Sequence, residues 1–247
     1  SAEGGAVYVN RLNFLGSDWY SDVTFYGDAH IGQGAENDGI TTEGDGYSSI
    51  NFEGDVVLDG DVGSAEKAVG EIHLYGEGAT LYLGGHVYAS EEVVPAIYLD
   101  NYYQTTEVAA GKNIDATIDA YGEDSTLTFL GSTTVSQPIG WYGDYALGAV
   151  NFNGGTVALN NAICAEDVFV NNDTALSVAA SLFADNSGEI DGSLTLQGTS
   201  SLDLGVNALH INALYAQGAG TTLKLTITDP VTYGYITCAT DKVSEAS

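Results

Sequence analysis

A five-residue phrase recurs along the chain and limits what it can fold into more than any other feature. Each copy has apolar residues at its first and third positions and closes on glycine or asparagine. Copies lie at residues 23–27, 50–54, 72–76, 97–101, 118–122, 127–131, 150–154, 168–172 and 194–198. Apart from one close pair, the closing residues are spaced 18 to 27 apart. Repeats of this length are typical of stacked coils, in which each repeat adds one layer.

The phrase also indicates what each layer contains. Alternating apolar residues predict a short strand with one buried face, and the closing glycine or asparagine predicts a tight turn with positive φ. We therefore expect an all-β chain folded as a single β solenoid, a right-handed parallel β-helix of about ten coils. A β-sandwich, which also has many short strands, is the alternative.

The predicted organisation has three parts. Residues 1–20 are rich in aromatic side chains and form an N-terminal segment that caps the first coil or docks on a neighbouring molecule. Residues 21–240 form the continuous β-helix, and residues 241–247 form a tail.

The third position of the phrase predicts a single inward file of side chains. Its members are Phe25, Phe52, Leu74, Leu99, Phe129, Phe152, Val170 and Leu196.

Charge is the second strong feature of the sequence. The chain has 34 acidic and 5 basic residues, which give a formal net charge of −29. Such a chain repels nucleic acid and anionic lipid, because phosphate contacts need lysine and arginine. No apolar run reaches the roughly 18 residues that cross a bilayer, so we expect no membrane insertion. Methionine is absent even at position 1, so we expect a processed chain or an excised segment.

Catalytic motifs are missing from the sequence, so we expect a protein that is not an enzyme. The four histidines lack the spacing of metal ligands, and there is no phosphate-binding loop or nucleophile turn. Cys164 and Cys238 are separated by more than three coils, so we expect no disulfide between them. A carbohydrate-active β-helical enzyme is the alternative, although the basic residues that would hold a substrate carboxylate are scattered.

Two acidic loops are weak candidates for calcium sites, and no other cofactor is expected. They contain Glu43 with Asp45, and Asp59 with Asp61. Calcium prefers such oxygen ligands on flexible loops. Ordinary turn chemistry of aspartate next to glycine is the favoured explanation of the same residues.

Tyrosine is unusually frequent, with 16 copies. Several tyrosines occupy outward positions of the phrase, and further aromatic residues lie in pairs. The predicted binding surface comprises Tyr26, Tyr75, Tyr98, Tyr102, Tyr103, Tyr121, Trp141 and Tyr142. Exposed tyrosines give contact area at a low entropy cost, which suits a glycan or a protein partner. Stacked tyrosines that only stabilise neighbouring strands are the alternative.

Residues 150–161, 194–205 and 220–230 resemble passenger segments of bacterial autotransporters, in particular the large rickettsia-like surface antigens. The resemblance covers about residues 115–240 and lies in composition and rhythm, although this chain is far more acidic. It implies an exported, non-enzymatic protein that is extracellular or on the cell surface. The expected role is a rigid acidic adhesin or display rod. Its partner would be a host or neighbouring-cell surface, a glycan, or copies of itself end to end. A self-assembling subunit of an extracellular filament or surface layer is the alternative.

Overall fold

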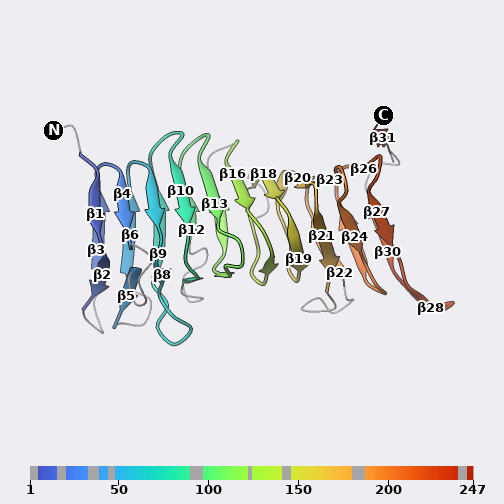
Figure 1. The fold of residues 1–247 in the computed structure, drawn as a ribbon, viewed down its shortest axis with the longest axis horizontal. Coiled ribbons are helices and arrows are strands. Elements are labelled where there is room, and N and C mark those ends of the chain that lie inside the picture. Colours follow the sequence, from blue (N-terminus) through green and yellow to red (C-terminus); the bar gives the residue numbers. More distant parts are fainter. Residues whose placement is uncertain are drawn as a thin grey trace.

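The computed structural model is a rod of stacked coils made of short, almost entirely parallel strands (Figure 1). It describes residues 5–15, 21–32, 39–43, 48–89, 97–121, 124–140, 146–179, 187–238 and 244–246. These residues contain no helix, and so none long and apolar enough to cross a membrane.

Sheet A runs along the whole rod and has 11 strands. They are β1 (Val7–Val9), β4 (Ala29–Ile31), β7 (Val56–Leu58), β10 (Thr80–Leu83), β13 (Thr105–Val108), β16 (Thr126–Phe129), β18 (Leu147–Phe152), β20 (Ala165–Val170), β23 (Ser193–Leu196), β26 (Tyr215–Gly218) and β31 (Ser244–Ala246).

Sheet C forms a second side. It begins with β3 (Ser21–Phe25), β6 (Ser48–Phe52), β9 (Glu71–Leu74), β12 (Ile97–Leu99) and β15 (Ile118–Ala120). Single bridges at Ile139 and Ile163 then link β15 to the later strands of this side. Those strands are β22 (Ser187–Ile190), β25 (Ala208–Ile211) and β30 (Tyr235–Cys238).

The third side is divided between two sheets. Sheet B serves the first coils with β2 (Arg11–Phe14), β5 (Gly39–Thr42), β8 (Asp61–Val62), β11 (Val87–Tyr88) and β14 (Ile114–Asp115). Sheet D serves the later coils with β17 (Thr133–Val135), β19 (Gly155–Leu159), β21 (Thr174–Val178), β24 (Ser201–Asp203) and β27 (Thr222–Lys224). An antiparallel pair, β28 (Ile227–Asp229) with β29 (Thr232–Tyr233), projects at the C-terminal end (Figure 1).

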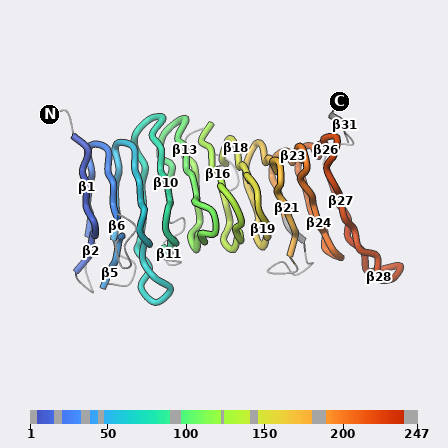
Figure 2. The backbone as a smooth tube through the Cα atoms, viewed as in Figure 1, coloured from blue at the N-terminus to red at the C-terminus, as the bar shows by residue number. Residues whose placement is uncertain are grey.

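Each turn of the chain visits sheet A, then sheet B or D, then sheet C, as the backbone trace shows (Figure 2). The predicted β solenoid is confirmed. Sheet A gains one strand per coil, and its 11 strands agree closely with the predicted number of about ten coils. The β-sandwich alternative is wrong, because neighbouring strands come from successive turns and run parallel. Residues 5–15 of the N-terminal segment contribute β1 and β2, the first strands of sheets A and B.

The predicted single inward file is wrong, because its members lie on two different sheets. Phe25, Phe52, Leu74 and Leu99 align on sheet C. Phe129, Phe152, Val170 and Leu196 align on sheet A. The strands of each coil are all short, and those of sheets A and C share the same alternating burial, so the phrase fits either sheet. The close pair of copies at residues 118–122 and 127–131 marks the point where it changes sides.

A second inward file lies on sheet C and holds the coils in register. Its members are Val23, Ile50, Ile72, Ile97, Ile118, Ile139, Ile163, Ile190 and Ile211. All but Val23 are almost fully buried. Stacked β-branched side chains pack well on a pleated surface, so this file continues even where sheet C narrows to single bridges.

Glycines close the phrase for two different reasons. Gly154 and Gly198 adopt positive φ, as predicted for a tight turn. Gly54 and Gly76 do not. A Cβ on Gly76 would instead lie 2.5 Å from the backbone oxygen of Glu53 in the coil before it. In the first coils, therefore, glycine allows neighbouring corners to approach each other closely.

Candidate binding edge

The corner between sheets C and A carries a regular column of outward side chains in the first five coils. Tyr26, Glu53, Tyr75, Asp100 and Tyr121 each follow the inward residue that ends a sheet C strand. A ladder of backbone hydrogen bonds, 2.7 to 3.0 Å long, fixes them in successive coils. Tyrosines and carboxylates therefore alternate along this corner. We call the column, together with Tyr102 and Tyr103, the tyrosine edge.

The tyrosines of this edge face solvent. Tyr26 is 82% exposed, Tyr121 is 66% exposed and Tyr75 is 38% exposed. Glu53 is also exposed, whereas Asp100 is half-buried. The edge therefore presents aromatic rings and carboxylates together on a backbone that neighbouring coils hold rigid.

A histidine stack lies directly beside the edge. The His73 ring lies 4.4 Å from the ring of Tyr98 and 5.4 Å from that of Tyr75, and all three rings are nearly parallel. Asp100 contacts its Nδ1 at 2.8 Å, and Glu71 contacts its Nε2 at 3.3 Å. Because the two carboxylates meet opposite ring nitrogens, they hold an imidazolium in place. They do not converge on a point where a metal ion could sit.

The surroundings of His73 favour its charged form. Burial by itself would lower the pKa of His73, but the hydrogen bonds and the attraction of Asp100 and Glu71 outweigh burial and raise it. The sequence showed only that His73 lacks the spacing of a metal ligand. Glu71 and His73 on β9 and Tyr75 directly after it alternate along the chain, and this alternation is the signal in the sequence. The register of β12 then places Tyr98 beside His73.

Tyr102 and Tyr103 extend the edge on the corner loop between β12 and β13. Their side chains are 52% and 61% exposed. Asn101 ties this loop to the preceding coil by donating to the Tyr75 carbonyl at 2.9 Å, and Gln104 donates to the carbonyls of Leu74 and Gly76. Tyr103 has a φ of 59°, which is rare for a bulky residue. The loop is therefore held in shape while both rings point away from the core.

Further along sheet C the side chains of Asp119 and Cys164 are buried. Asp119 is 6% exposed, and burial raises its pKa to about 6. Burial, together with the hydrogen bond to Asp191, raises the pKa of the Cys164 thiol to about 12. A thiol that stays protonated is a poor nucleophile. Cys164 and Cys238 are both free, as predicted.

The structure separates the calcium candidates. The Asp59 carboxylate lies 2.7 Å from Nε2 of His30, and that of Asp61 accepts the backbone N–H of His86 at 2.8 Å. Asp61 is level with the start of β5, whereas Glu43 follows the end of that strand. Asp45 lies outside the described residues. Within the described ranges no three or more acidic, histidine or cysteine side chains gather as metal ligands.

The structure brings six of the eight predicted surface aromatics to this edge or beside it. Tyr26, Tyr75, Tyr102, Tyr103 and Tyr121 belong to the edge, and Tyr98 lies next to it in the histidine stack. Trp141 and Tyr142 lie outside the described residues.

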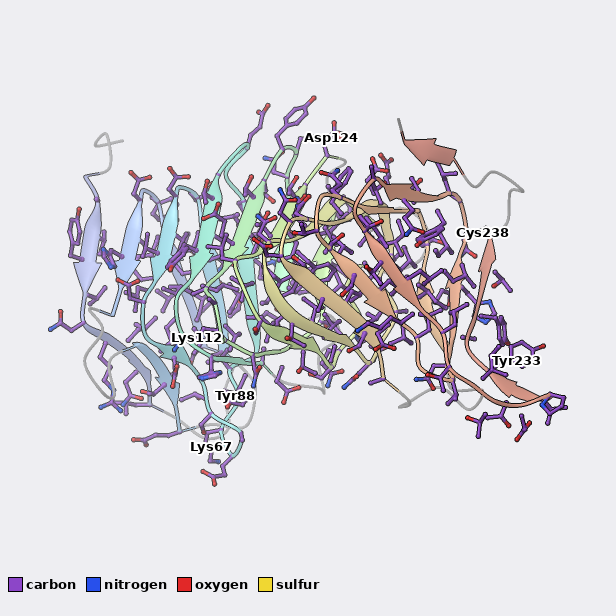
Figure 3. All side chains as sticks on the ribbon, turned by 45° about the vertical axis from the view of Figure 1, so that its right-hand side comes forward. Lys67, Tyr88, Lys112, Asp124, Tyr233 and Cys238 are labelled. Carbon is purple, nitrogen blue, oxygen red and sulfur yellow. The ribbon has the colours of Figure 1, made fainter. Side chains whose placement is uncertain are left out.

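Lysine and arginine side chains are absent from the edge as far as the structure describes it. Figure 3 labels Asp124 on the side of the rod where the chain passes from sheet C to sheet A, and it places Lys67 and Lys112 on the opposite side. Arg11 lies on sheet B and Lys224 on sheet D. The carboxylates of the edge therefore have His73 as the only neighbouring cationic group among the described residues.

In comparisons with known proteins, no family model, no curated protein and no solved structure matches the chain.

Proposed function

We propose that this chain is a non-enzymatic binding rod that acts as an adhesin or display element outside the cell or on its surface. The observation that carries this proposal is the tyrosine edge, where exposed rings and carboxylates alternate on successive coils. A parallel stack holds its outward side chains at fixed spacing, so contacts with an extended partner add along the rod.

The composition of the edge supports a role in recognition. Tyrosine supplies a large contact surface and a hydroxyl group, and it loses little conformational entropy when it binds. The net charge of −29 disfavours nucleic acid and anionic lipid as partners. The Cys164 thiol stays protonated, and Asp100 and Glu71 contact both ring nitrogens of His73, so neither side chain offers a nucleophile to a partner.

A matched pair of triple variants tests the proposal. The first combines Tyr26→Ser, Tyr75→Ser and Tyr121→Ser, which removes the rings of the edge. The second combines Tyr88→Ser, Tyr233→Ser and Tyr235→Ser, which removes three tyrosines that lie on the opposite side and at the C-terminal end (Figure 3). Fluorescently labelled protein is incubated with panels of cells and immobilised glycans. We expect binding to fall for the first variant and to persist for the second, with circular dichroism confirming that both remain folded. Equal binding by both would count against the edge.

Self-assembly into a filament or surface layer is a second candidate, favoured by apolar side chains at the two ends of the rod. Ile227 and Val231, at the C-terminal end, are 76% and 87% exposed, and Leu15 in the first coil is 71% exposed. Open strand ends and apolar side chains favour pairing between molecules. If the rods assemble end to end, deletion of residues 1–20 will abolish oligomers and leave a folded β-rich rod. A monodisperse monomer at high protein concentration and high salt would remove this candidate.

A further inference from the structure

We propose that the tyrosine edge binds an extended β-1,4-linked polysaccharide whose sugars carry free amino groups. This inference rests on the proposed function, because it names the class of ligand for the same edge.

The spacing of the tyrosines matches such a chain. Tyr26, Tyr75 and Tyr121 lie two coils apart. At about 4.8 Å per coil, their separation is about 9.6 Å. This distance is close to the length of two sugar rings in an extended β-1,4-linked chain. Every second sugar presents the same face, so each of these sugars would place its apolar C–H face against one tyrosine ring.

The charges of the edge select amino sugars among such chains. Glu53 and Asp100 occupy the coils between the tyrosines. The exposed Glu53 carboxylate would lie level with an intervening sugar, whereas the Asp100 carboxylate is only 18% exposed and already pairs with His73 at 2.8 Å. A carboxylate binds an ammonium group more strongly than it binds a neutral hydroxyl. The carboxylates have no lysine or arginine beside them in the described part of the chain, and the net charge of −29 repels an anionic polysaccharide.

The corner loop of Tyr102 and Tyr103 gives independent support for a binding role. A bulky residue with positive φ is strained, and such residues gather at functional sites. Tyr103 accepts this strain although its ring is 61% exposed and gains little from burial. The loop lies in the same coil as Asp100, so its rings would contact the chain beside the intervening sugar.

A basic peptide is the competing ligand, because it would satisfy the same carboxylates. An extended peptide repeats its side chains on one face every two residues, or about 7 Å. This repeat falls out of step with tyrosines about 9.6 Å apart. The spacing therefore favours the polysaccharide.

Isothermal titration calorimetry of the full chain tests the proposal with three probes. The probes are a hexamer of β-1,4-linked glucosamine, its fully N-acetylated counterpart and a lysine hexapeptide, each at low and at physiological salt. We expect the glucosamine hexamer to bind at both salt concentrations. The acetylated hexamer and the peptide should bind at least about tenfold more weakly, because each lacks one of the two matching features.

Variants then assign the binding to the edge. The triple variant Tyr26→Ser, Tyr75→Ser, Tyr121→Ser should lose at least about tenfold in affinity for the glucosamine hexamer, and Glu53→Gln should lose a smaller factor. Tyr88→Ser, Tyr233→Ser, Tyr235→Ser is the control for the rings. Glu166→Gln, at an exposed carboxylate of β20, is the control for the charge. Both controls should keep the affinity of the unmodified chain.

Four results would overturn the inference: no binding of the glucosamine hexamer, equal affinity for the lysine peptide, equal affinity for the acetylated hexamer, or unchanged binding by the tyrosine variant. If the glucosamine hexamer fails to bind but the tyrosine variant still loses cell-surface binding, the ligand class is wrong and the proposed function stands. If the tyrosine variant keeps its cell-surface binding, the proposed function itself fails.

Discussion

The first five coils, β1 to β15, and the later coils, β16 to β30, use the same phrase for different corners. In the first coils the phrase lies on sheet C and closes where the chain passes to sheet A. In the later coils it lies on sheet A and closes where the chain passes to sheet D. The third-position residues of the phrase are buried in both regions, Phe25 alone being half-buried.

The two regions differ in what they present to solvent. The first coils place tyrosines and carboxylates at the corner between sheets C and A. At the corner between sheets A and D, the later coils present Leu130 followed by three amides, Asn153, Asn171 and Gln197. A repeated phrase therefore fixes the core of a solenoid, while the corner at which it closes decides which outward residues line up into a surface.

The largest effect is expected from truncating one buried phenylalanine of the phrase in each region. Phe52 and Phe152 are both fully buried, so Phe52→Ala and Phe152→Ala should each cost about 3–5 kcal/mol of unfolding free energy. Hydrogen exchange read by mass spectrometry should rise around β3, β6 and β9 in the first variant and around β16, β18 and β20 in the second. The half-buried Phe25 gives a milder control as Phe25→Ala. If both core variants raised exchange in the same strands, the two files would not be separate units.

The buried carboxyl of Asp119, in the last of the first five coils, predicts a pH effect. Its folded pKa of about 6 lies above the roughly 3.9 of an unfolded aspartate. Its contribution to stability is therefore present below pH 4 and is lost as the pH rises through 6. Asp119→Asn should raise the free energy of unfolding at pH 8 by up to about 3 kcal/mol, seen as a higher melting temperature, and bring no gain near pH 4.

The raised pKa of His73 acts in the same direction, so the variant is compared with the unmodified chain at each pH. Asp167→Asn, at an exposed carboxylate of the later coils, is the control for the loss of one charge. A gain from Asp119→Asn that is the same at pH 4 and pH 8 would contradict the assignment.

A smaller change in stability is expected when corner residues with positive φ are replaced by glycine, and it should differ between the two regions. Tyr103, in the first coils, should tolerate glycine with a gain of up to about 1 kcal/mol, because glycine removes the strain. Asp173 has a φ of 60° in the later coils, but its carboxylate accepts the Thr199 hydroxyl at 2.9 Å. Asp173→Gly should therefore bring no gain. Chemical denaturation measures both, with Tyr102→Gly as a control at ordinary φ. A loss of stability in Tyr103→Gly would show that the ring is needed for folding.

The smallest effect is expected from salt. Acidic residues are more numerous before residue 122 than after it, and their repulsion weakens as ions screen it. The free energy of unfolding should rise with ionic strength or with calcium by less than about 1 kcal/mol, seen as a higher melting temperature. Hydrogen exchange should slow more in β3 to β15 than in β16 to β30. A flat melting response from low to high salt, with and without chelator, would remove both the screening and the calcium hypotheses.

Much of the candidate site was predictable from outward positions of the phrase. Tyr26, Tyr75 and Tyr121 share its fourth position, and the alternation of a strand turns that position away from the core. His73 was not recognised, because its partners Asp100 and Tyr98 come from the next coil. Their meeting depends on register, which the spacing between copies, ranging from 18 to 27 residues, does not specify.

The sequence by itself determined the class of fold, because apolar alternation closed by glycine at a regular period can bury its side chains only by stacking coil upon coil. It also determined the charge, which depends on composition alone. Tertiary structure decided which side of the rod each copy of the phrase occupies, because three sides of similar strands accept the same local pattern. Only the hydrogen-bonded register between coils chose among them, and that choice divided the inward file in two and aligned tyrosines with carboxylates along one corner.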